Sequence, residues 1–240
     1  MKAPWPATTP HPIVALDVPE LKDAKELVRR LGTAPDFYKV GLQLYTREGP
    51  TVVEWLKGEG KRVFLDLKLH DIPNTVRGAT LAAVALGVDL LTVHAIGGIE
   101  MLEFAVRATA GTPTRILAVT VLTSFDDAAY GEAIGAQGIN LGNAVRRLAA
   151  VAAKAGALGV ICAGAEVAGI RAAHGEDFAT VVPGLRPEGS DANDQARTST
   201  PAELRAAGAT WTVVGRAVTA ANDPERAFGQ VVAALSGNPT

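Results

Sequence analysis

The chain has 240 residues, of which 48% are hydrophobic and 20% are charged, and its formal net charge is −2. This composition is typical of a globular protein with ample apolar material for a core, and neither the net charge nor any local Lys/Arg cluster indicates nucleic-acid binding. Because Cys162 is the single cysteine and no secretory signal or membrane-length apolar run is evident, we expect a cytoplasmic protein without disulfides that binds no membrane.

Short apolar or β-branched segments recur along the chain, and each is followed by a segment rich in Ala and Leu. The eight expected strands are 13–18, 37–44, 62–69, 90–95, 115–122, 159–163, 180–185 and 210–215. Several of the intervening helices have clear ends. Pro19 and Pro73 are placed to open two of them, and Thr200 with Glu203 forms a capping box before another.

Strands that alternate with helices predict a parallel sheet covered by helices. Eight such units in this length favour an α/β fold closed into a single (β/α)8 TIM barrel. An open dinucleotide-binding sheet would carry a Gly-rich loop after its first strand, where this chain has Ala-Leu-Asp-Val-Pro. We therefore expect one domain over 1–240, with 1–12 as an N-terminal extension. The longest gap between strands, 123–158, should hold a loop over the barrel mouth before its helix.

Charged residues interrupt the strands where a barrel interior should be apolar. Asp66 and Lys68 alternate with leucines in the third strand, so both should point into the barrel near its carboxyl end, where catalytic groups of this fold lie. Asp71 follows just beyond that strand, Lys39 interrupts the second strand, and Asp17 lies near the end of the first. Together these residues indicate an active site.

Each charge also has a structural interpretation. Asp71 could simply favour the N-terminus of the helix that begins at Pro73. Asp66 and Lys68 could be a structural ion pair, although burying a pair costs desolvation energy and is a weak source of stability. Lys39, taken alone, is more typical of a surface lysine whose stem is buried.

The segment 66–75 reads Asp-Leu-Lys-Leu-His-Asp-Ile-Pro-Asn-Thr and resembles the signature of the orotidine 5′-phosphate decarboxylase family. Its Asp-x-Lys-x-x-Asp core is shared with sugar-phosphate enzymes of the same barrel superfamily. Further segments resemble family motifs in the family's order: Ala-Leu-Asp17, Lys39-Val-Gly-Leu, Val-Leu-Thr123-Ser124, Pro-Gly-Leu-Arg186-Pro, Gln195 and Val-Gly215-Arg216. The resemblance covers nearly the whole chain.

The resemblance implies decarboxylation of orotidine 5′-monophosphate to uridine 5′-monophosphate, a step of pyrimidine biosynthesis, without a metal or organic cofactor. Lys68 would face the carbanion at C6 as an ammonium ion and then protonate it, because fixed charge can stabilise an anion that has no electron sink. Asp66 and Asp71 would favour the charged form of Lys68, and Lys39 would extend an alternating Lys–Asp–Lys–Asp chain. In the family, Asp71 and Thr75 reach the neighbouring subunit's site, which implies a homodimer with shared sites.

Phosphate sites in such barrels follow strands seven and eight, where Arg186, Gly215 and Arg216 fall. The polar stretch between Arg186 and Arg197 resembles a lid, with Gln195 closing on the phosphate. The remaining substrate contacts implied by the resemblance are Asp17, Lys39 and Thr75 near the ribose, and Thr123 or Ser124 at the pyrimidine or its carboxylate.

Two rival functions remain. A metal-dependent epimerase or decarboxylase acting on a sugar phosphate would need a carboxylate/His cluster, which Asp66 and His94 could begin, although Lys68 would compete with the metal. A non-catalytic nucleotide-binding protein would keep the pocket and lose the chemistry, but the intact Lys68 argues against it.

Overall fold

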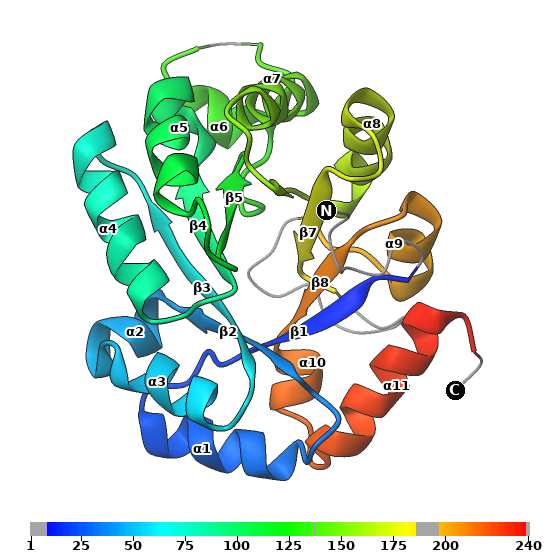
Figure 1. Cartoon of the computed structure of the whole chain (residues 1–240). Helices are drawn as coiled ribbons and strands as arrows, with labels where there is room; N and C mark the ends of the chain where they lie inside the picture. The colour runs from blue at the N-terminus through cyan, green and yellow to red at the C-terminus, as the bar shows by residue number, and fades with distance from the viewer. Residues whose placement is uncertain (1–8, 137, 186–196, 239–240) are drawn as a thin grey trace.

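The computed structural model describes residues 9–136, 138–185 and 197–238. Eight parallel strands close into a barrel in sequence order, because β1 pairs with both β2 and β8, and helices surround it (Figure 1). The strands are β1 His11–Ala15, β2 Phe37–Gly41, β3 Arg62–Leu69, β4 Leu90–His94, β5 Arg115–Val119, β6 Gly159–Ile161, β7 Ala179–Pro183 and β8 Trp211–Val214. The predicted (β/α)8 TIM barrel is confirmed.

The helices follow the strands in the expected alternation. They are α1 Leu21–Arg30, α2 Leu42–Glu48, α3 Thr51–Gly58, α4 Pro73–Ala85, α5 Gly98–Ala108, α6 Asp127–Ala133, α7 Leu141–Lys154, α8 Gly164–His174, α9 Pro201–Ala207, α10 Arg216–Thr219 and α11 Pro224–Ser236, with a 3-10 turn at Ala95–Gly97. None of the helices in the described part of the chain has the length and apolar character to cross a membrane.

Local sequence explains several helix ends. The Thr200 hydroxyl accepts a hydrogen bond from the backbone N–H of Glu203, and the Glu203 carboxylate accepts one from the N–H of Thr200. This is the predicted capping box. Pro73 is the first residue of α4, as expected, whereas α1 begins two residues after Pro19.

Most expected strands extend too far at their carboxyl ends. The apolar run beyond Gly41 belongs to α2, and the run beyond Val119 leaves the sheet and lines a cavity through Val121 and Leu122. Hydrophobicity alone does not distinguish a strand residue from an apolar residue in the loop that follows it. At the other end of the first strand, β1 begins at His11. The expected extension falls mainly on residues 1–8, which lie outside the described residues.

The segment between β5 and β6 holds more structure than expected. A short helix, α6, precedes α7 and is capped by Asp126, whose carboxylate accepts the N–H of Ala129 at 2.8 Å. Asn140 caps α7 in the same way through the N–H of Asn143 at 2.9 Å. Asp and Asn are residue types that favour the N-cap position, so both helix starts could have been predicted from the sequence.

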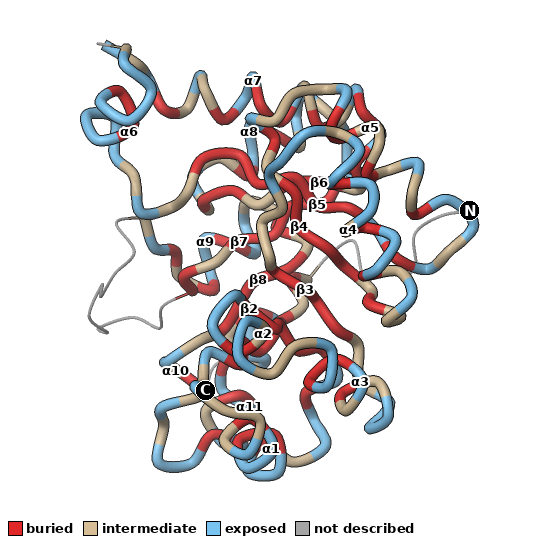
Figure 2. Tube along the Cα trace, turned by 90° about the vertical axis from the view of Figure 1, so that its left-hand side faces the viewer, coloured by how far each residue is buried: buried red, intermediate tan, exposed pale blue. Residues whose placement is uncertain are grey.

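Two apolar clusters hold the barrel together, and buried residues follow the strands in Figure 2. The larger cluster lies between the sheet and the helices, and the smaller one fills the barrel. Phe37 and Trp211, the first residues of their strands, and Phe64 within β3 are fully or almost fully buried in the smaller cluster. Large side chains therefore fill the barrel toward its N-terminal end, which leaves room for polar groups at the carboxyl ends of the strands.

Candidate active site

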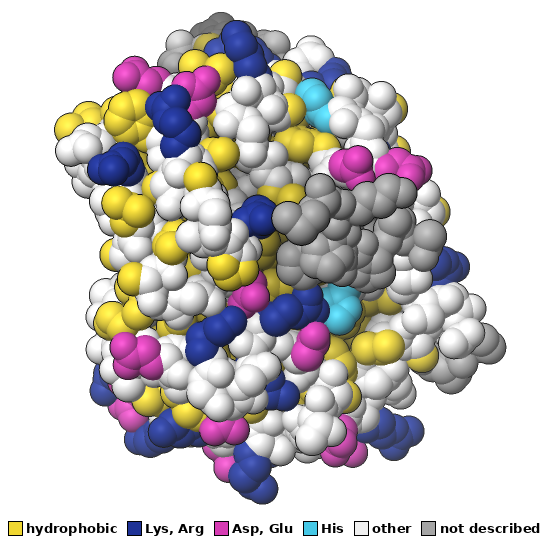
Figure 3. All heavy atoms as spheres, in the orientation of Figure 1, with side chains coloured by type: hydrophobic (Ala, Val, Ile, Leu, Met, Phe, Trp, Pro, Cys, Tyr) yellow, Lys and Arg dark blue, Asp and Glu magenta, His cyan; other side chains and the backbone are white. Residues whose placement is uncertain are grey.

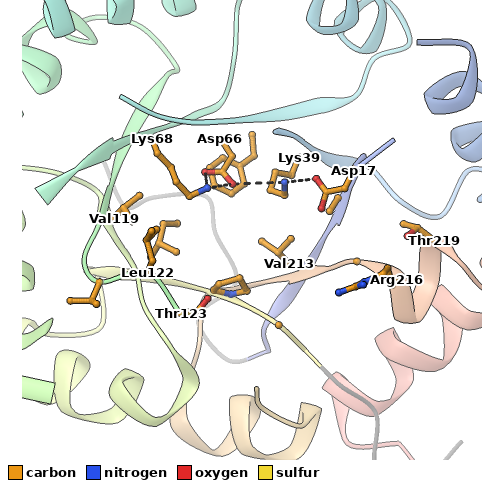
Figure 4. Close-up of a pocket in the computed structure, with 17 residues that line it drawn as sticks. Asp17, Lys39, Asp66, Lys68, Val119, Leu122, Thr123, Val213, Arg216 and Thr219 are labelled. Atoms are coloured by element: carbon orange, nitrogen blue, oxygen red, sulfur yellow. Dashed lines mark hydrogen bonds and ion pairs between the residues drawn. The ribbon is translucent and has the colours of Figure 1, made fainter. Parts of the chain in front are cut away.

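A cavity of about 460 Å³ lies at the carboxyl ends of the strands. This volume is within the range of sites for small molecules. Its lining includes Asp17, Lys39, Asp66 and Lys68 from the first three strand regions, and Arg216 from the start of α10 (Figure 4). In the orientation of Figure 1, basic and acidic side chains lie close together near the centre of this face (Figure 3). The predicted position of the site, at the barrel mouth, matches this cavity.

Four of the predicted charges form one connected network (Figure 4). Lys68 Nζ donates to both carboxylate oxygens of Asp66, at 2.9 and 2.8 Å. Lys39 Nζ lies 3.8 Å from Asp66 Oδ2 and donates to Asp17 Oδ1 at 2.9 Å. The side chains of Lys39 and Asp66 are only 11% and 12% exposed, against 29% for Lys68 and 62% for Asp17. The inner charges are therefore paired with one another, while Lys68 keeps an open side toward the cavity.

The backbone at Lys68 departs from a regular strand. The pairing of β3 with β4 shifts register between Leu65 and Leu69. Lys68 has φ 51°, the only positive φ at a non-glycine residue among the described residues. A left-handed conformation costs an L-residue roughly 1–2 kcal/mol, and such strain clusters at functional sites. Asp66 and Lys68 share the cavity as predicted, but through a bulge rather than simple alternation.

Thr92 in β4 is a residue that the sequence reasoning missed. It is fully buried, its hydroxyl accepts the backbone N–H of Lys68 at 2.8 Å, and it donates to Asp66 Oδ1 at 3.0 Å. The available signal was a polar residue inside the apolar run Leu-Leu-Thr-Val. Threonine is common in strands, so this signal alone would not have separated it from a structural residue.

Asp71 and Thr75 do not line the cavity of their own chain. Both are exposed, and Asp71 Oδ1 accepts the N–H of Ile72 at 2.6 Å. Within one chain the alternating network therefore stops at Lys68 rather than continuing to Asp71, and at its other end Lys39 connects it to Asp17. The position of Asp71, two residues before α4, also fits the helix-dipole interpretation. Its role in a neighbouring subunit stays a prediction.

The opposite side of the cavity is mainly apolar. Val119, Val121, Leu122, Ile161 and Val213 line it from β5, β6, β8 and the loop after β5. Thr123 also lines the cavity, whereas Ser124 is not among the lining residues. Of the two alternatives, Thr123 is therefore the one whose position allows contact with a ligand in the cavity.

The predicted phosphate end is partly described. Gly215 and Arg216 line the cavity directly after β8, and Gly184 lines it after β7. Arg186 and Gln195 lie outside the described residues. A guanidinium and backbone N–H groups at a helix start are suited to binding a phosphate.

His94 and Cys162 do not take part in the network. Burial lowers the pKa of His94, and the neighbouring His70 and Lys68 lower it further. The Cys162 thiol is buried, which raises its pKa far above the usual range. Within residues 9–136, 138–185 and 197–238, no three His, Cys, Asp or Glu side chains come together as metal ligands, so Asp66 and His94 do not begin such a cluster there.

Comparisons with known proteins agree with this geometry. The model of the orotidine 5′-phosphate decarboxylase / HUMPS family matches residues 10–231. The orotidine 5′-phosphate decarboxylase of Nitrosococcus oceani is 45% identical over 226 residues, covering 93% of this chain and 97% of the relative. The enzyme of that name from Anaeromyxobacter sp. (strain K) is 50% identical over 221 residues, covering 92% and 96%.

A solved structure of orotidine 5′-phosphate decarboxylase from Lactobacillus acidophilus superposes with a TM-score of 0.83 at 35% identity, covering 95% of this chain and 99% of that one. The family match spans all eight strands and every described residue of the charged network. The chain belongs to the orotidine 5′-phosphate decarboxylase / HUMPS family.

Proposed function

We propose that the chain decarboxylates orotidine 5′-monophosphate to uridine 5′-monophosphate in the cytoplasm, without a metal or organic cofactor. The observation that carries the proposal is the Lys68 ammonium, held by both oxygens of Asp66 and facing a nucleotide-sized cavity. The curated relatives that carry this activity in their names match over more than nine tenths of the chain.

The reaction asks the site to stabilise negative charge on carbon. The bond between C6 and the carboxylate breaks, CO₂ leaves, and the electron pair stays on C6. Lys68, already oriented by Asp66 before the substrate arrives, provides fixed positive charge beside C6 with little reorganisation. One Nζ–H proton then moves to C6, and the neutral amine regains a proton from solvent.

The other cavity residues would bind and orient the nucleotide. Gly215 and Arg216 would hold the phosphate, together with Arg186 and Gln195. Asp17 and Lys39 would contact the ribose, and Thr123 the pyrimidine. Binding energy from the phosphate, remote from C6, can offset the cost of bringing the substrate carboxylate into a site that contains aspartates.

We also propose that two chains share their sites in a homodimer. Asp71 and Thr75 are exposed, so in their own chain they are free to reach across an interface. Next to them Ile72 is 68% exposed, and Leu42 and Ile96, which follow β2 and β4, are 54% and 51% exposed. Because β2, β3 and β4 are neighbours in the barrel, these apolar side chains lie on one rim. Apolar patches of this kind mark interaction surfaces.

The deciding assay follows orotidine 5′-monophosphate consumption by absorbance in the presence of a chelator. We expect turnover that survives exhaustive chelation. Turnover that is lost on chelation and restored by a divalent cation would favour the metal-dependent rival. Binding of uridine 5′-monophosphate without any turnover would favour the non-catalytic one.

The shared site has its own test. A Lys68→Ala chain and an Asp71→Ala chain should each be nearly inactive, and mixing them should form heterodimers with one intact site. With random exchange, half the dimers are mixed and each has one of two sites intact, so activity should recover to roughly a quarter of wild type. No recovery after verified subunit exchange would contradict the shared site.

A further inference from the structure

The bulge in β3 leaves Lys68 in need of support from outside the regular ladder. On β3 the pairs Leu65–Leu91 and Leu69–Val93 enclose three residues, whereas on β4 they enclose only Thr92. The first and third of these enclosed residues are Asp66 and Lys68, the two residues to which the chemistry is assigned above. A single side chain on β4 therefore faces the whole irregular segment.

Thr92 bonds both of these residues through one oxygen. A hydroxyl has one proton to donate and lone pairs to accept. The backbone N–H of Lys68 can only donate and an ionised Asp66 can only accept, so the direction of both bonds is fixed. Thr92 Oγ1 accepts from Lys68 at 2.8 Å and donates to Asp66 Oδ1 at 3.0 Å.

These bonds complete a hydrogen-bonded ring that includes the ammonium group of Lys68. The same Asp66 Oδ1 accepts a hydrogen bond from Lys68 Nζ at 2.9 Å. Thr92 thus fixes Lys68 at both ends, at the backbone directly and at Nζ through Asp66. The φ of 51° at Lys68 is a conformation that surrounding structure must maintain, and the bond from its N–H to Thr92 is a contact that does so.

Two other buried threonines, one within β8 and one directly before β5, show what a purely structural hydroxyl does in this fold. The hydroxyl of Thr212 donates to the carbonyl of Val182 at 3.1 Å, and that of Thr114 to the carbonyl of Val88 at 2.7 Å. Both threonines are fully buried, as Thr92 is. Thr92 differs because its proton goes to a carboxylate of the charged network.

We propose that Thr92 is a positioning residue for the decarboxylation: its hydroxyl holds the left-handed backbone of Lys68 and the carboxylate of Asp66 so that the ammonium faces C6. This inference rests on the proposed function. Because Thr92 does not line the cavity, it should act on the rate of the chemical step and not on nucleotide binding.

The test compares Thr92→Val, Thr92→Ser and a matched control, Thr114→Val. Valine keeps the shape of threonine but removes both bonds, and a displacement of about 1 Å at a reacting group can lower a rate by roughly 10²-fold. We expect Thr92→Val to lower kcat by about that factor while KM and the Kd of uridine 5′-monophosphate change less than about threefold. Thr92→Ser should restore kcat to within about threefold of wild type, and Thr114→Val should leave kcat unchanged.

A wild-type kcat in Thr92→Val, an equal loss in Thr114→Val, or no recovery in Thr92→Ser would overturn the proposal. If Thr92→Val does not fold, Thr92→Cys carries the same comparison, since a thiol is of similar size and a weak hydrogen-bonding group. The wild-type rate separately reports the proposed function. If wild type shows no turnover, a crystal structure of the Thr92 variant decides: an unchanged φ at Lys68 and an unchanged Lys68–Asp66 contact would refute positioning.

Discussion

The two sides of the cavity are built on opposite principles (Figure 4). The β1–β3 side carries the connected charges Asp17, Lys39, Asp66 and Lys68. The β5–β8 side presents an apolar wall, with Arg216 following β8. Paired charges on one side have a fixed geometry, and an apolar wall on the other side reduces the screening of their field by water. Under the proposed function, the β1–β3 side carries the reacting charges, and the β5–β8 side supplies the apolar surroundings that strengthen their field.

The largest expected effect is on the charged side. We expect Lys68→Ala to lower kcat by roughly 10⁴-fold or more, because it removes a proton donor, worth about 10²–10⁴, and a fixed charge, worth about 10²–10³. Steady-state and single-turnover kinetics measure this loss. Lys57→Ala is the control. The Nζ of Lys57 lies 2.9 Å from Asp89 Oδ2, and neither residue lines the cavity. A Lys68→Ala rate within tenfold of wild type would remove the chemistry from this side.

Arg216 tests whether the opposite side contributes more than a wall. Arg216→Ala should lower kcat/KM by roughly 10²–10³-fold, about 3–4 kcal/mol, because it loses charge-assisted hydrogen bonds to phosphate. Turnover of orotidine, which has no phosphate, should be the same in the variant and in wild type. Arg226→Ala, on α11 and outside the cavity, serves as the control. An equal loss with both substrates would contradict the assignment to phosphate.

Behind the apolar wall lies a half-buried ion pair, which tests whether charge there serves stability rather than chemistry. Arg197 bonds Glu166 and donates to the carbonyl of Leu122, a wall residue, at 3.3 Å. Glu166 also accepts the N–H of Ala163 at 2.7 Å. We expect Arg197→Met to lower the free energy of unfolding at neutral pH by about 1–3 kcal/mol, because it leaves a half-buried carboxylate without its charged partner.

The pH dependence gives this prediction its sign. Burial raises the pKa of Glu166 and Arg197 opposes that rise, so the variant should raise the pKa further. A raised folded-state pKa means that the group's contribution is most favourable below its unfolded value of 4.5 and is lost as pH rises through the folded value. In urea unfolding, the loss in Arg197→Met should therefore shrink from neutral pH toward pH 5. In a Glu166→Gln/Arg197→Met double variant, the loss in the free energy of unfolding should not depend on pH. A pH-independent loss in the Arg197→Met single variant would contradict this account.

The two sides also differ in how much the sequence could predict. A charge inside a strand is unusual, so Asp66, Lys68 and Lys39 indicate a site from the sequence alone. An apolar residue in a strand looks the same whether it packs in the core or lines a cavity, so the wall was not predicted. The bulge at Lys68 depends on pairing with β4, and the local sequence alternates regularly there. The barrel itself was predictable because alternation along the whole chain specifies it.

The smallest expected effect separates wall from core within a single strand. Val213 lines the cavity, whereas its neighbour Val214 is fully buried among the residues between sheet and helices. Val213→Thr adds a hydroxyl to the wall and should lower kcat by about tenfold, or ~1.4 kcal/mol, because it increases the polarity of the medium around Lys68. The free energy of unfolding should change little, since the cavity can solvate the new group.

Val214→Thr should show the reverse pattern. Its hydroxyl would be buried in the apolar layer, which should lower the free energy of unfolding by about 1–3 kcal/mol and leave kcat near wild type. Kinetics and urea unfolding of the two variants measure the crossed effects. If Val213→Thr keeps the wild-type kcat, the apolar wall only shapes the cavity, and the paired charges alone determine the electrostatic field at Lys68. If both variants lose stability and both keep the wild-type kcat, the apolar wall belongs to the core, and the charged side accounts for the chemical step without it.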